Sequence, residues 1–348
     1  MLNRTPFLGG FAMVCLSALP LRADAPRVAA DIPPVHALVA QVMAGVGAPD
    51  LIVAPGASPH GYALRPSEAR TLQDAELVVW VGPGLTPWLE SALPGLASGA
   101  EILRLDVAPA TRRLPMRDSA DFAAVGTEGH EEADDHADDH GHDDHADEHG
   151  HEEHHHDDDH VDEGDHGHGH DHGAGDGVDP HMWLDPANGR AWLDVIAAAL
   201  SRIDPDNAAR YAANAAAAQA DLLTLEQALA ARLAADPPSP FVVFHDGYQY
   251  LESAFDLPAA GAIVLADGSD PSPARIAEIR AVVRDRGVRC AFAEPQLNTA
   301  LITTVIDGTD AAIAEVDPLG ATHAPGPALY GAVLRDIVDA LVTCGAPD

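Results

Sequence analysis

Three widely separated histidines could together bind a metal ion. His60 comes shortly after the apolar run LIVAP, His181 lies in DPHMWLDP, and His245 directly follows FVVF. Open α/β sheets bind ligands just beyond the carboxyl ends of their strands, so residues that follow such strands can meet at one place. Neutral imidazoles are typical zinc ligands and hold the ion in tetrahedral geometry. The three positions therefore predict a zinc site, although each histidine taken alone could also be a hydrogen-bonded loop residue.

Two carboxylates occupy similar positions and could contribute to the same site. Asp317 follows the apolar run AAIAEV, and Glu294 follows VRCAFA. Three histidines leave one tetrahedral position open, which a carboxylate or a water molecule could fill. Both acidic residues are therefore candidates for the neighbourhood of the metal.

A second set of possible metal ligands lies in residues 119–179, which consist mainly of Gly, Asp, Glu and His. Fifteen of the 20 histidines fall between His130 and His172. A segment with so few apolar residues is expected to be disordered without metal. Its irregular spacing predicts many weak zinc sites, and the candidate accessory ligands are His136, His140, His142, His145, His149, His151, His154, His155, His156, His160, His166, His168, His170 and His172. We expect this insert to capture or sense zinc that the site of His60, His181 and His245 then holds. The alternative is a solvated loop that binds metal incidentally.

Alternating apolar strands and amphipathic helices predict an α/β fold of two Rossmann-like lobes. The first lobe is expected over residues 26–206, including the insert, and the second over 236–348. Between them, residues 207–235 are rich in Ala, lack Gly and Pro, and keep helical spacing of Leu. As a rigid helix they would span about 43 Å. Ser67 and Ser272 are expected to cap helices.

The charge is concentrated in the insert. The formal net charge is −36, yet residues 128–179 contain 22 acidic residues and no Lys or Arg. The remainder carries 33 acidic against 19 basic residues, a balance of −14. This moderate acidity argues against nucleic acid as a partner.

Residues 1–25 are expected to be a cleaved signal peptide. Arg4 precedes an apolar run over residues 6–21, and Ala23 and Ala25 form a possible cleavage motif. The alternative is an uncleaved anchor. Export to the periplasm would place the two remaining cysteines, Cys290 and Cys344, in an oxidising compartment, which suggests a disulfide; two unpaired buried thiols are the alternative.

Five motifs give the chain a family resemblance. In order along the chain they are GASPHGYALRPSEA, DPHMWLDP, VFHDGYQYLE, FAEPQL and DPLG. Together they resemble the periplasmic zinc-binding receptors of bacterial ABC importers, the ZnuA type within the metal-binding (cluster A-I) solute receptors. The resemblance implies two Rossmann-like lobes, a long connecting helix and one metal in the interlobe cleft, with His60, His181 and His245 as ligands.

The resemblance also suggests roles for other residues. Asp317 matches a position where related receptors use an aspartate ligand, with water as the competing choice. Some relatives carry a glutamate before the first histidine, but Pro59 stands there in this chain. Glu294 belongs to a familiar FxEPQ motif and is expected to support the site without binding the metal. Cys290 and Cys344 match a cysteine pair of zinc-type relatives. His36 and His323 are interpreted as non-ligands.

The predicted function is that of a zinc receptor, not of an enzyme. It would deliver Zn²⁺ to a membrane permease powered by an ATPase, as a monomer that makes only small lobe motions. Manganese receptors place a glutamate where His245 stands, so a manganese receptor is the less favoured alternative. A periplasmic zinc buffer or adhesin is another alternative, and a zinc hydrolase is the least favoured. Zinc binding should weaken as the pH falls through about 6.5, the reference pKa of histidine.

Overall fold

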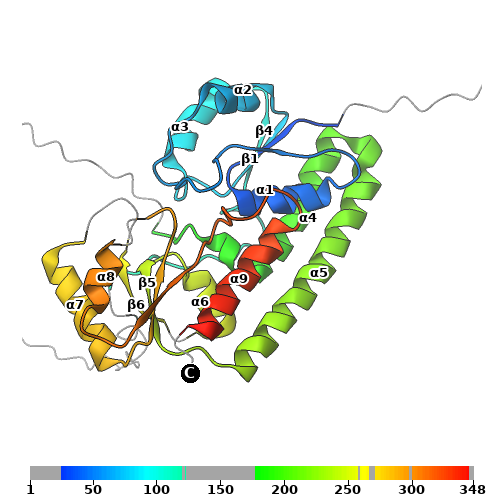
Figure 1. The fold of residues 1–348 in the computed structure, drawn as a ribbon. Coiled ribbons are helices and arrows are strands. Elements are labelled where there is room, and N and C mark those ends of the chain that lie inside the picture. The colour runs from blue at the N-terminus through cyan, green and yellow to red at the C-terminus, as the bar shows by residue number, and fades with distance from the viewer. Residues whose placement is uncertain are drawn as a thin grey trace, which may run out of the picture.

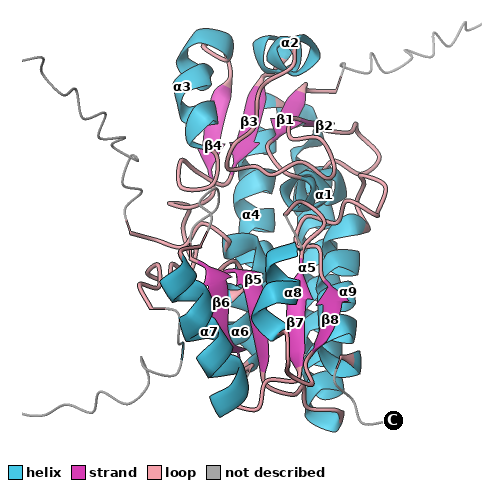
Figure 2. Cartoon of the chain, turned by 60° about the vertical axis from the view of Figure 1, so that its left-hand side comes forward, coloured by secondary structure: helices cyan, strands magenta, loops and turns pink. Residues whose placement is uncertain are grey.

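The computed structural model describes residues 25–119, 122, 177–257, 259–265, 271–297 and 300–344. Its strands form two four-stranded sheets in which neighbouring strands run parallel, and Figure 2 shows the sheets one above the other. The strands are β1 (Val28–Ala30), β2 (Asp50–Leu51), β3 (Leu77–Trp80), β4 (Glu101–Arg104), β5 (Phe241–His245), β6 (Ala259–Val264), β7 (Cys290–Ala293) and β8 (Ala312–Glu315). Their order is β2-β1-β3-β4 and β6-β5-β7-β8. The predicted α/β class is confirmed.

Helices connect and cover these strands, as parallel connections require. The helices are α1 (Pro33–Val42), α2 (Pro66–Asp74), α3 (Pro87–Leu96), α4 (Pro186–Ile203), α5 (Ala208–Ala235), α6 (Gln249–Phe255), α7 (Pro273–Asp285), α8 (Ala300–Ile306) and α9 (Leu329–Thr343), with short 3₁₀ turns η2 (Met182–Leu184) and η3 (Pro205–Asn207). Among these described helices, none combines the length and the apolar character needed to cross a bilayer.

The two predicted helix caps have different outcomes. Ser272 caps α7 as expected: its hydroxyl accepts a hydrogen bond from the backbone N–H of Arg275 at 3.2 Å. Ser67, in contrast, does not cap α2, so that prediction is wrong. The helix begins two residues earlier than a Ser67 cap would place it, at Pro66, with Arg65 as the N-cap. Glu68 accepts the backbone N–H of Arg65 at 2.7 Å. Proline at the first helical position sets the start.

The long helix α5 joins the two lobes. Its 28 residues extend about 42 Å at the usual rise per residue, and it runs alongside both lobes (Figure 1). It buries one stripe of residues: Tyr211, Ala215, Ala218, Leu222, Leu225, Leu229 and Leu233. This stripe packs against α4, α1 and α9, which come from different parts of the chain. The helix is therefore held along its length and is not a free rod.

The C-terminal helix α9 connects the lobes a second time. It follows the last strand of the second sheet, yet it packs against α1 of the first lobe as well as against α5. The side chain of Gln41 donates to the carbonyl of Pro327 at 2.6 Å, just before α9. Tyr330, fully buried in α9, donates to the carbonyl of Trp183 at 2.7 Å. The lobes are thus joined by one exposed and one buried hydrogen bond in addition to the packing of α9 on α1.

A disulfide links α9 to the second sheet. Cys290 in β7 bonds to Cys344, the residue after α9, with their Cα atoms 5.9 Å apart. Both cysteines are buried. The bond agrees with the disulfide suggested by the sequence.

Removing this disulfide should destabilise the protein substantially. The bond closes a loop of 54 residues, for which restriction of the unfolded chain is worth about 4 kcal/mol. Urea unfolding of the metal-free C290A/C344A variant should show a loss of that order relative to wild type. Reductant should lower the stability of wild type toward that of the variant and leave the variant itself unchanged. A loss below about 1 kcal/mol would show that the loop is already restricted in the unfolded chain.

Candidate metal centre

The structure brings the three predicted histidines together between the lobes. His60 lies in the loop after β2, His181 immediately before η2, and His245 at the end of β5. One ring nitrogen from each lies within 4.8 Å of those from the other two. His181 is central, since its ring centroid is 5.3 Å from that of His60 and 5.0 Å from that of His245. The strand-end argument therefore identified residues that do converge.

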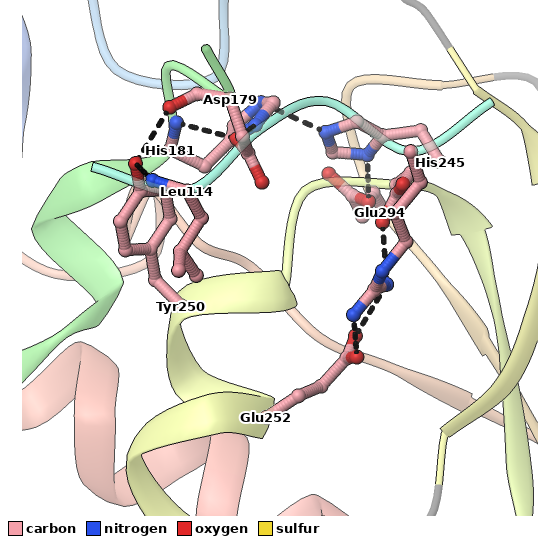
Figure 3. A network of polar contacts seen from close by, with 9 residues as sticks. Leu114, Asp179, His181, His245, Tyr250, Glu252 and Glu294 are labelled. Atoms are coloured by element: carbon pink, nitrogen blue, oxygen red, sulfur yellow. Dashed lines mark hydrogen bonds and ion pairs between the residues drawn. The ribbon is translucent and has the colours of Figure 1, made fainter. Parts of the chain in front are cut away.

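Two of the imidazoles are oriented by carboxylates. Nδ1 of His181 bonds to Oδ1 of Asp179 at 2.8 Å, and Nδ1 of His245 bonds to Oε1 of Glu294 (Figure 3). A carboxylate only accepts hydrogen bonds, so each Nδ1 carries the proton and each Nε2 offers a lone pair. The two Nε2 atoms lie 3.2 Å apart. Two imidazole nitrogens this close together are placed to bind one metal ion jointly.

Asp179 is a site residue that the sequence reasoning missed. By composition Asp179 belongs to the acidic insert, and its position two residues before His181 is the one sequence signal for a role in the site. Its Oδ1 also accepts the backbone N–H of His181 at 2.9 Å, and Tyr250 donates to its carbonyl at 3.0 Å (Figure 3). Glu294, 3% exposed, contacts His245 as a supporting carboxylate would. Such partners fix the orientation and raise the basicity of metal-binding imidazoles.

A glycine gives the ring of His245 its space. A Cβ atom at Gly247 would lie 2.3 Å from Nε2 of His245, far inside contact distance. The HDG sequence therefore allows the imidazole to fold back over the backbone at the end of β5. Any side chain at position 247 would displace the metal-facing nitrogen.

Asp317 lies near the centre but outside the histidine cluster. Its Oδ1 accepts the backbone N–H of Leu319 at 2.9 Å and the amide of Gln296 at 2.8 Å. Its Oδ2 accepts the backbone N–H of Ala321 at 2.5 Å. Gln296 itself lines the small cavity at the three histidines, together with Trp183. Ligation of the metal by Asp317 therefore stays a prediction.

An ion-pair network lies beside the histidines and connects the two lobes. Arg117 donates to Oδ1 of Asp246 at 2.8 Å and also pairs with Glu252 in α6. All three side chains are largely buried, with 14%, 5% and 7% of the side chains of Arg117, Asp246 and Glu252 exposed. Burial raises the pKa of Glu252 to about 7, although the Arg117 guanidinium opposes this shift. Asp246 directly follows His245, so the network touches the metal centre.

The two ends of the insert meet at this network. Backbone hydrogen bonds join Met116 to Gly177 at 2.8 Å and Asp179 to Leu114 at 2.9 Å. The insert therefore leaves and rejoins the fold next to His181. Its 14 accessory histidines lie outside the described residues, as do residues 1–24 of the expected signal peptide, and the roles of both stay predictions.

The other two histidines of the described chain lie elsewhere. Nε2 of His36 bonds to the carbonyl of Pro49 at 3.0 Å, and Nε2 of His323 bonds to Asp336 at 2.6 Å. Neither belongs to the cluster of His60, His181 and His245.

Two parallel α/β lobes, a long joining helix and three histidines between the lobes define a metal-binding solute receptor. Residues 28–344 match the family model described as zinc-uptake complex component A, periplasmic (ZnuA). The chain belongs to this family, which consists of the solute-binding components of transporters and not of enzymes.

Individual relatives support this membership. The chain is 45% identical over 333 residues to the high-affinity zinc uptake system protein ZnuA of Paracoccus denitrificans (strain Pd 1222), with 95% of each chain covered. It is 39% identical over 338 residues to the protein of that name from Brucella abortus (strain 2308), with 97% and 96% covered. A crystal structure of ZnuA shares the fold, with a TM-score of 0.66 at 23% identity, over 91% of this chain and 99% of that chain.

Proposed function

We propose that this chain captures Zn²⁺ in the periplasm at His60, His181 and His245 and delivers it to the membrane permease of an ABC-type importer. One observation carries the proposal: three imidazole nitrogens from separate parts of the chain converge within 4.8 Å. Three nitrogen donors favour zinc over manganese, which prefers oxygen ligands. Zinc is thus the transported substrate and not a resident cofactor. Its partners would be the permease and its ATPase; we expect a monomer that is exported with a cleaved signal peptide.

The acidic insert is proposed to be an accessory to this centre. Its ends are joined by the backbone bonds between residues 114–116 and 177–179, so metal bound by the insert would be held near the cleft. The high density of carboxylates would also raise the local concentration of divalent cations. Ordering a flexible segment around each ion costs conformational entropy, and we therefore expect its sites to be weaker than the cleft.

A deletion within the insert tests which site is the receptor site. The variant should lack residues 125–174, which leaves the joined ends and Asp179 in place. Competition titration with a chromophoric zinc chelator should show one tight site per chain, with the weak sites of the wild type lost. The control is the same deletion with H181A, in which tight binding should also disappear. If the deletion alone removes tight binding, the insert is the receptor site and the proposed role of the three histidines is wrong.

A further inference from the structure

Gln296 is the amide side chain at the metal centre that the proposed function does not yet use. It lies two residues after Glu294, in a turn closed by the backbone bond from Leu297 to Glu294 at 3.1 Å. The turn follows β7, so Glu294 and Gln296 leave the same strand end. Both line the cavity with His60, His181 and His245.

The orientation of this amide is set by Asp317. The Nε2 group of Gln296 donates to Oδ1 of Asp317 at 2.8 Å, and a carboxylate cannot donate in return. The Oε1 oxygen is therefore turned away from Asp317. Asp317 cannot easily move, because the backbone N–H groups of Leu319 and Ala321 also bind its carboxylate.

The Oε1 oxygen of Gln296 is buried and accepts no hydrogen bond from any described residue. Buried acceptors are normally satisfied, and an exception calls for a functional or structural explanation. A hydrogen-bond donor that enters the site together with the metal would satisfy this oxygen and explain why it is unpaired without the metal. Three histidines leave one position of a tetrahedral zinc ion for a further ligand, and water is the usual one in such sites.

We propose that Gln296 is a positioning residue of the zinc site, an inference that rests on the proposed function. Its Oε1 accepts a hydrogen bond from a water molecule that occupies the fourth metal position. Asp317 acts behind it by holding the amide in the orientation that presents oxygen. This proposal replaces the predicted direct ligation of the metal by Asp317: Asp317 is coupled to the metal through Gln296 and water.

The substitution Q296L tests this role in the full-length protein. It keeps the approximate size of the side chain and removes the acceptor. The zinc Kd should rise about 10- to 100-fold, the range for loss of a group that supports a metal ligand. The absorption spectrum of the protein with one equivalent of Co²⁺ should shift, because the water loses its hydrogen bond. The melting temperature of the metal-free protein should change little, because Q296L removes an unsatisfied buried oxygen but also the hydrogen bond from Gln296 to Asp317.

Two further variants separate positioning from structural effects. Q219L is the matched control, because the amide of Gln219 donates to the carbonyl of Arg190 at 3.0 Å, outside the metal centre; it should leave Kd and spectrum unchanged. D317N should weaken zinc binding by about the same factor as Q296L. The double variant Q296L/D317N should be little worse than either single one, because both act through one hydrogen-bonded chain.

The outcomes distinguish this proposal from the proposed function. If wild type itself lacks a tight zinc site, the proposed function fails. If wild type binds tightly and Q296L behaves as Q219L does, only the role of Gln296 is overturned. A third outcome would also overturn the proposal. If D317N weakens zinc binding far more than Q296L does, and the Co²⁺ spectrum of Q296L is not shifted, Asp317 is a direct ligand.

Discussion

Replacing His181 by alanine should remove tight zinc binding. His181 is the central member of the cluster, with its ring beside those of both His60 and His245. Protein zinc sites with four ligands bind with roughly 10–16 kcal/mol, so one imidazole accounts for about 3–4 kcal/mol. At 1.4 kcal/mol per tenfold change, the Kd should rise roughly 10²- to 10³-fold. Competition titration against a chromophoric chelator measures this directly.

His323 provides the matched control for this experiment. It is also a histidine paired with a carboxylate, Asp336, but it lies outside the cluster. H323A should bind zinc as wild type does, and both variants should keep the wild-type circular dichroism. Tight binding that survives in H181A would mean that the histidine cluster does not hold the metal. Equal losses in H181A and H323A would point instead to a general effect of removing histidines.

Local sequence patterns were enough to predict most of the fold and the three central histidines. Strand β5 begins with the continuous apolar run FVVF and is buried throughout, which is typical of parallel sheets covered on both faces. Parallel strands place their carboxyl ends at one edge, so His245 and Glu294 could be expected to lie close together before any contact was known. The family resemblance added the expected set of ligands. These features depend on the order of residues within short segments, which can be read directly from the sequence.

Contacts between distant residues had no such local signal. Arg117 lies 129 residues from Asp246 and 135 from Glu252, and nothing near Arg117 indicates these partners. The hydrogen bond from Gln296 to Asp317 spans 21 residues and depends on how two loops meet. The error at Ser67 has a different cause: a favourable cap residue was present, but Pro66 one position earlier set the helix start.

The ion pairs of Arg117 are expected to be essential for stability. Arg117 belongs to the segment that follows the first sheet, while Asp246 and Glu252 belong to the second lobe, and all three side chains are largely buried. Removing one partner of a buried ion pair leaves uncompensated charge and typically costs about 3–5 kcal/mol. R117M keeps much of the apolar stem and removes the charge. Urea unfolding of the metal-free protein at pH 8 should therefore show a loss of about that size.

The pH dependence of this loss identifies its cause. Burial already raises the pKa of Glu252 to about 7, and burial also raises the pKa of Asp246; Arg117 lowers both. Without Arg117 both pKa values should rise further in the folded protein. An acid with a raised folded-state pKa stabilises the fold below its unfolded pKa and loses that contribution as the pH rises through the folded value. The difference between R117M and wild type should consequently be largest at pH 8 and smaller at pH 5.5, where the carboxyl groups can bind protons.

Two comparisons make the argument about Arg117 testable. R190M removes a more exposed pair, since Arg190 and Glu226 have side chains 26% and 27% exposed, and it should cost less than about 1 kcal/mol. Adding E252Q to R117M removes one of the two buried carboxylates that lost their positively charged partner, and it should recover part of the stability at pH 8. If R117M and R190M cost the same, or if E252Q recovers nothing, buried charge is not what Arg117 compensates. The apolar contacts of α5 and α9 would then hold the two lobes together, and the ion pairs would only orient the side chains beside His245.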